Sequence, residues 1–251
     1  MSFTEASKSG WALLKRNSRA VLGAGVVSYI IVLGVLFGAG QLVIAKANQP
    51  IEPTSYWHSL STTYKVCWLL GFVLSAWMPQ LMTYAGAAWI ALQETKGESA
   101  STSGTVRAIV ARLPSLILLT LLIGVPAFIG GLLLVIPGLV VSAIGVMIVP
   151  EMVIGGRKLG AAIRLGIRVG WKHAATTGLT LVLAGVSAAM LFIFLTSIPL
   201  PSGVGLALLL FGALMFAGSV TSAWVGAVIS AICIEHHRPS VANVGSHGHV
   251  S

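Results

Sequence analysis

Long apolar runs without any charged residue alternate along this chain with short polar segments. Runs free of Asp, Glu, Lys and Arg cover residues 20–45, 66–93, 113–150 and 174–234. A helix needs about 20 apolar residues to cross the hydrocarbon core of a bilayer. The first two runs, of 26 and 28 residues, have room for one such helix each, and the runs of 38 and 61 residues have room for two each.

Turn signals divide the two longest runs. Pro137 and Gly138 predict a hairpin turn in the third run, and the segment 199–203, with two prolines and a glycine, predicts another in the fourth. We therefore expect an all-α integral membrane fold with six transmembrane helices arranged as three hairpins. The expected spans are about 20–45, 66–92, 114–136, 139–154, 174–197 and 204–234. Residues 1–234 would form a single membrane domain, followed by a disordered cytoplasmic tail at 235–251.

A short amphipathic interfacial helix is predicted before each hairpin. The clearest one precedes the fifth span, where Arg157, Arg164, Arg168 and Lys172 share one sector of a helix and apolar residues occupy the opposite side. Basic side chains of a helix at the membrane–water interface contact lipid phosphates, while the apolar face of the helix enters the membrane. The three segments of this kind are 1–19, 106–113 and 155–173.

The first of these segments also carries a helix start signal. Ser2 and Glu5 have the spacing of a capping box, so a helix is expected to begin there. Lys15 and Arg16 lie close to Trp11, and a tryptophan beside basic residues is typical of the membrane interface. Lys15 and Arg16 therefore join Arg157, Arg164, Arg168 and Lys172 as predicted contacts for lipid headgroups or for an acidic partner.

The distribution of basic residues predicts the orientation. With the N-terminus inside, cytoplasmic segments hold thirteen of the fifteen Lys and Arg residues, and only Lys46 and Lys65 lie outside. This is the bias expected of a multi-pass protein of the bacterial inner membrane with both termini cytoplasmic. Cys67 and Cys233 then lie on opposite sides of the membrane, so no disulfide is expected between them.

Composition agrees with a membrane protein and narrows the partners. Hydrophobic residues make up 56% of the chain and charged residues only 8%, which is too little polar surface for a soluble domain. The net charge of +9 lies beside the spans, so anionic headgroups at the cytoplasmic face account for it and nucleic acid is not expected. A membrane-protein partner or a second copy of the chain remains open.

Small residues recur at four-residue spacing in the first and last spans. Such stripes let helix backbones approach closely, and lining a pore is the alternative reading. We predict helix packing at Gly34, Gly38, Gly218, Ser222, Gly226 and Ser230.

The spans offer no sign of catalysis. Charged residues in the middle of a span mark proton relays and coupled transport, whereas Glu94, Glu151 and Glu235 all lie at predicted span ends. The histidines at 236, 237, 247 and 249 fit a solvated tail better than a metal site. We expect a non-enzymatic protein without a cofactor that has a structural, lipid-associated or partner-regulating role. The alternative is a transporter or channel for a small neutral or lipid-like solute.

Several short motifs resemble a known family. They are Ile136-Pro137-Gly138, Val149-Pro150-Glu151, the stretch 160–164, Gly170-Trp171 and the opening stretch 10–15. The pattern is similar to the membrane domain fused to some bacterial glycerophosphodiester phosphodiesterases and to YciC-like inner-membrane proteins. The resemblance implies a stand-alone six-helix membrane domain without assigned activity. Phosphodiesterase chemistry is not implied, because it belongs to a separate soluble barrel for which this chain has no room.

Overall fold

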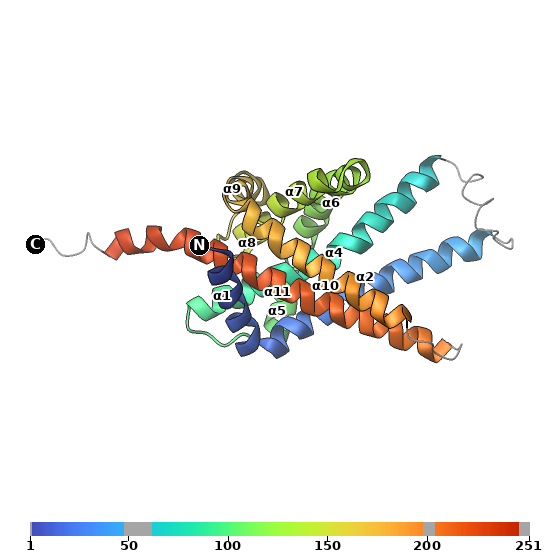
Figure 1. Ribbon diagram of the computed structural model, residues 1–251, viewed down its shortest axis with the longest axis horizontal. Coiled ribbons are helices and arrows are strands. Elements are labelled where there is room, and N and C mark those ends of the chain that lie inside the picture. The colour runs from blue at the N-terminus through green and yellow to red at the C-terminus, as the bar shows by residue number, and fades with distance from the viewer. Residues whose placement is uncertain (1, 48–61, 198–203, 246–251) are drawn as a thin grey trace, which may run out of the picture.

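The computed structural model describes residues 2–47, 62–197 and 204–245, and within these ranges every regular element is an α-helix (Figure 1). The helices are α1 (Phe3–Arg16), α2 (Ser18–Ala47), α4 (Thr62–Thr95), α5 (Thr102–Val110), α6 (Leu113–Leu133), α7 (Val135–Gly145), α8 (Ile148–Val153), α9 (Leu159–Lys172), α10 (Ala174–Ser197) and α11 (Val204–Gly245). The predicted all-helical class is confirmed. The predicted turn at 199–203 lies outside the described residues.

Three of the described segments are long and apolar enough to cross a membrane. They are α6, the pair α7–α8 taken together as Val135–Val153, and Phe216–His237 within α11. Shorter apolar stretches occupy Ser18–Val32 of α2 and Ala174–Ser187 of α10. The chain thus has the helices of a membrane protein, and the full set of six spans in three hairpins remains a prediction.

The helices fan out from one crowded end of the bundle. Figure 1 shows α1, α5, α8 and α9 gathered at this end, while α2, α4, α10 and α11 extend away from it. The long helix α11 contacts α1, α2, α4 and α10, and α4 also packs against α2 and α6. Fully buried Leu81 and Tyr84 of α4 and Ile229 and Ile232 of α11 mark the core between these helices.

The first helix begins where the capping signal predicts. Ser2 Oγ accepts a hydrogen bond from the Glu5 backbone N–H at 3.3 Å, and Glu5 Oε2 accepts one from the Ser2 backbone N–H at 2.8 Å. These hydrogen bonds favour the ionised carboxylate and lower the pKa of Glu5. The reciprocal pair satisfies two backbone donors that the first turn of a helix leaves free.

The hairpin turn predicted at Pro137 and Gly138 is displaced. The chain breaks at Leu134, which has extended φ and ψ of −157° and 132°, and α7 begins at the next residue. Pro137 is accommodated in the first turn of α7, where a missing backbone N–H costs little. Gly138 serves packing instead, because a Cβ there would lie 2.6 Å from the backbone nitrogen of Gly131 on α6.

The last helix extends into the segment for which a disordered tail is predicted. The predicted tail begins at residue 235, but α11 continues as a helix to Gly245. His237 contacts the buried Glu151 of α8, which holds the start of this segment against the bundle. Residues 246–251 lie outside the described part of the chain.

The predicted stripe of small residues on α11 faces its neighbours in the bundle. Gly218 lies against the ring of Tyr29, whose hydroxyl is 3.2 Å from Ser222 Oγ. A Cβ at Gly226 would lie 2.9 Å from Ala87 Cβ on α4. One turn later, Ser230 is fully buried and donates a hydrogen bond to the carbonyl of Gly226.

The corresponding pair on α2 does not form such a contact within the chain. A Cβ at Gly34 would have no atom within 4 Å, so the helix packing predicted there has no counterpart in this bundle. Gly38 belongs to α2, but its surroundings are outside what the structure describes. The difference follows from the fan-like arrangement, because α2 leaves the bundle as it moves away from the crowded end (Figure 1).

We predict that Gly226→Ala destabilises the bundle, because the new Cβ would lie 2.9 Å from Ala87 Cβ and 3.0 Å from Tyr84 Cα. The expected loss is about 1–3 kcal/mol in the free energy of unfolding, the usual cost of overpacking. Titration of the detergent-solubilised protein with dodecyl sulfate, followed by circular dichroism, would measure it. Gly212→Ala on the same helix is the matched control, because a Cβ there meets nothing within 4 Å. Equal stability of the two variants would contradict the packing role.

Candidate functional site

The basic helix α9 is held against the bundle by two glycines. A Cβ at Gly166 would lie 2.6 Å from Ile148 Cα of α8, and one at Gly170 would lie 2.6 Å from the carbonyl oxygen of Ile144 on α7. Only residues without a side chain allow such close approach of two backbones. The buried face of α9 is therefore fixed, and its basic face points away from α7 and α8.

The exposed face of α9 carries a shallow hollow of about 480 Å³. We call it the α9 hollow; its lining residues are Arg157, Gly160, Ala161, Arg164, Leu165 and Arg168. All three arginines are exposed, and in the part of the chain that the structure describes no carboxylate lines the hollow. Lys172 is exposed at the C-terminal end of the same helix, next to exposed Trp171. The predicted cationic surface is thus present as a concave site.

One of the four predicted basic residues of this face is not helical. α9 begins at Leu159, so Arg157 lies in the connector that follows α8. Gly156 has a φ of +60°, a left-handed conformation that glycine adopts without strain, and it turns the chain there. The turn lets the Arg157 side chain reach both the α9 hollow and Glu151, whose Oε2 lies 3.8 Å from Arg157 Nε.

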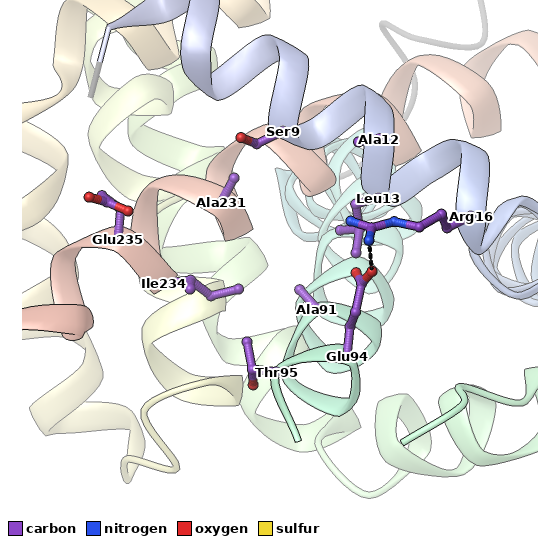
Figure 2. Close-up of a pocket in the computed structure, with 10 residues that line it drawn as sticks. All are labelled: Ser9, Ala12, Leu13, Arg16, Ala91, Glu94, Thr95, Ala231, Ile234 and Glu235. Atoms are coloured by element: carbon purple, nitrogen blue, oxygen red, sulfur yellow. Dashed lines mark ion pairs between the residues drawn. The ribbon is translucent and has the colours of Figure 1, made fainter. Parts of the chain in front are cut away.

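The two basic residues of α1 belong to a separate surface. Lys15 Nζ lies 5.7 Å from the ring centre of Trp11, in the range of a cation–π contact. Arg16 pairs with Glu94 of α4 at 2.9 Å (Figure 2). The Arg16 side chain is 67% exposed, so this ion pair contributes at most about 1 kcal/mol.

A second hollow lies between α1, α4 and α11. It measures about 390 Å³, and Figure 2 shows the Arg16–Glu94 ion pair at one side of it and Glu235 of α11 at the other. Its remaining lining is small or apolar, with Leu13, Ala91 and Ile234 among the residues. Because the arginine charge is already paired with Glu94, this hollow is a weaker candidate for binding an anion than the α9 hollow.

A buried polar cluster lies beside the α9 hollow. Glu151 of α8 is fully buried, and its Oε2 lies 3.1 Å from His237 Nε2 on α11. Cys233, one helical turn before His237, places its Sγ 3.4 Å from Glu151 Oε1. An ionised carboxylate away from water is costly unless it is paired and hydrogen-bonded. Arg157, His237 and the Cys233 thiol supply these partners.

This cluster is not among the predicted site residues. The sequence places Glu151 at a span end and His237 in a tail, 86 residues further along the chain. One signal was available, because Cys233 and His237 are four residues apart and therefore share a face if α11 continues that far. The helix does continue, and α8 turns Glu151 toward that face.

Three polar residues in the middle of α4, Gln80, Thr83 and Tyr84, form hydrogen bonds within their own helix. Thr83 Oγ1 donates to the carbonyl of Pro79 at 2.8 Å, and Gln80 Nε2 donates to the carbonyl of Ala76 at 3.0 Å. Tyr84 donates its hydroxyl hydrogen to Gln80 Oε1 at 3.3 Å.

Comparison with known proteins found no matching family model, no matching curated protein and no matching solved structure.

We predict that Gly166→Ala loosens α9, because the added Cβ would lie 2.6 Å from Ile148 Cα, and backbone cannot yield as a flexible side chain can. Hydrogen exchange of the α9 amides in detergent should become faster, and unfolding should cost about 1–3 kcal/mol less. Gly160→Ala on the same helix meets no atom within 4 Å and should leave exchange unchanged or slower. Similar exchange in both variants would show that α9 is not seated as described.

Proposed function

We propose that this chain is a non-enzymatic protein of the bacterial inner membrane that binds anionic lipid headgroups in the α9 hollow. The observation that carries the proposal is the set of three arginines, Arg157, Arg164 and Arg168, around a concave surface that no carboxylate of the described residues lines. Guanidinium groups match phosphate oxygens with paired hydrogen bonds, so arginine is well suited to a phospholipid headgroup. A structural or partner-regulating role would use the same surface.

The surroundings of the α9 hollow suit a whole lipid as well as its headgroup. α10 begins two residues after α9 ends, and its exposed side chains include Leu179, Leu183 and Val186. Acyl chains would lie along this apolar helix while the phosphate is bound by the arginines. The exposed indole of Trp171 fits the headgroup depth between the two.

The proposed topology is six spans with both termini cytoplasmic. α2, α4 and α10 would add three spans to the three segments that already qualify, since they occupy the predicted ranges and have 30, 34 and 24 residues. The bias of thirteen basic residues against two supports an inside location for α1, α5 and α9. The α9 hollow would then face the cytoplasmic leaflet, where anionic lipids attract basic side chains.

We predict that Arg164→Gln with Arg168→Gln weakens anionic lipid binding. Each basic residue near an anionic membrane surface contributes about 1 kcal/mol, so the double variant should bind roughly 10- to 30-fold more weakly. Titration of the protein in neutral detergent with short-chain phosphatidylglycerol, and in parallel with short-chain phosphatidylcholine, would measure this. The double substitution should lower the affinity for phosphatidylglycerol but not for phosphatidylcholine. Binding of phosphatidylglycerol should also weaken with added salt.

The matched control removes two charges elsewhere on the same proposed side. Lys96 and Arg107 are both exposed, and neither lines the α9 hollow. Lys96→Gln with Arg107→Gln should therefore leave phosphatidylglycerol binding within about twofold of the unchanged protein, because distant exposed charges are screened by salt. An equal loss in both double variants would mean that total charge, not the α9 hollow, governs binding.

The topology makes a separate prediction. In a Cys67→Ser background, where Cys233 is buried, single cysteines at Thr62 and Ser99 would report the two ends of α4. Both positions are exposed. An impermeant maleimide added to intact cells should label Thr62→Cys, whereas Ser99→Cys should react only after the membrane is opened. Labelling of Ser99→Cys in intact cells would overturn the orientation.

A further inference from the structure

We propose that Glu151, Cys233 and His237 bind one Zn²⁺ ion at the end of the bundle beside α9. The three side chains come from α8 and from two successive turns of α11. Their ligand atoms, a carboxylate oxygen, the thiol sulfur and an imidazole nitrogen, all lie within 4.8 Å of one another. Nitrogen, sulfur and oxygen donors of this kind are the set that zinc sites use.

The spacing of these atoms suits a tetrahedral ion. Zinc bonds of about 2.0–2.3 Å place neighbouring ligand atoms about 3.3–3.6 Å apart. Glu151 Oε2 and His237 Nε2 are 3.1 Å apart, and Cys233 Sγ lies 3.4 Å from the other carboxylate oxygen, Oε1. With one ligand atom taken from each residue, the three atoms lie within 4.8 Å of one another, so rotation of the carboxylate and small shifts of the side chains would bring them to zinc spacing. Three protein ligands leave a fourth position for water, as in zinc sites that are not purely structural.

Charge balance favours the ion in this apolar setting. The Glu151 carboxylate and a Cys233 thiolate carry two negative charges, and with neutral His237 they compensate Zn²⁺ completely. Binding releases the thiol proton to the solvent. Glu151 and Cys233 are fully buried, so a neutral assembly costs less than a lone carboxylate would.

Arg157 is the group that competes with the ion for Glu151. Its Nε lies 3.8 Å from Glu151 Oε2, which is beyond hydrogen-bond length, and its side chain is 42% exposed. The guanidinium can therefore turn toward the α9 hollow, which it already lines. The His237 side chain is 27% exposed and provides the side from which an ion would enter.

The test uses the full chain without a polyhistidine tag, purified in detergent, with Cys67→Ser, His247→Gln and His249→Gln as the background. After dialysis against Zn²⁺, elemental analysis should find one zinc per chain, and competition with a chromophoric chelator gives the affinity. Glu151→Gln, Cys233→Ser and His237→Gln should each weaken binding by roughly 100-fold, at least as much as losing an outer-shell partner costs. His236→Gln is the matched control and should bind as the background does.

A second measurement needs no variant in the cluster. Loading the background protein with Co²⁺ in place of Zn²⁺ should give a thiolate-to-metal charge-transfer band, and only Cys233 remains to produce it. That band supports the site even if a cluster variant fails to fold. A background protein that binds no zinc, cobalt binding without the band, or unchanged affinity in all three variants would overturn the proposal. The outcome does not depend on lipid binding, because no lipid is added.

Discussion

Close contact between helix backbones along α11 is the constraint on which the rest of this structure depends. In a membrane, apolar side chains gain little by leaving lipid for protein, so helices associate through tight packing and a few polar contacts. α11 meets this demand on two sides. At Gly226, α11 packs closely against Ala87 and Tyr84 of α4. At Val228, α11 packs against α1, where a Cβ at Gly10 would lie 2.9 Å from the Val228 backbone nitrogen.

Close backbone contact at glycine also positions the basic face of α9. α9 packs against α7 and α8 through Gly166 and Gly170, so Arg164 and Arg168 lie on its exposed face. α8 is only six residues long and lies between this contact and α11, which it also touches. α8 directs the Glu151 side chain into the bundle, against the turn of α11 that carries Cys233. The glycine contact between α9 and α8 and the buried carboxylate of Glu151 therefore both lie on α8, at the crowded end of the bundle.

The sequence predicted those features that depend on local pattern. Uncharged runs predicted long helices, and the spacing of Ser2 and Glu5 predicted the start of α1. The turn near Pro137 was misplaced by three residues because proline is tolerated in the first turn of a helix and so marks a break only approximately.

The Glu151 cluster depends on tertiary placement, which pattern alone does not contain. Glu151 and Cys233 are separated by 82 positions, and nothing local to either residue indicates the other. Two features assemble the cluster: the break that sets α8 apart from α7 places Glu151 beside Cys233, and the continuation of α11 past residue 235 adds His237. The second was missed because Gly, Ser and His near the C-terminus are typical of a solvated tail, while the contact of His237 with a buried carboxylate favours helix instead.

Arg157 links the α9 hollow to the buried Glu151 cluster. Its side chain lines the α9 hollow, and its Nε lies 3.8 Å from Glu151. A carboxylate this close partly neutralises the guanidinium and weakens the attraction of the hollow for an anion. A cation bound at Glu151 would offset that attraction and leave more of the Arg157 charge available to the α9 hollow. The two sites are coupled in this way because the left-handed turn at Gly156 places a single side chain beside both.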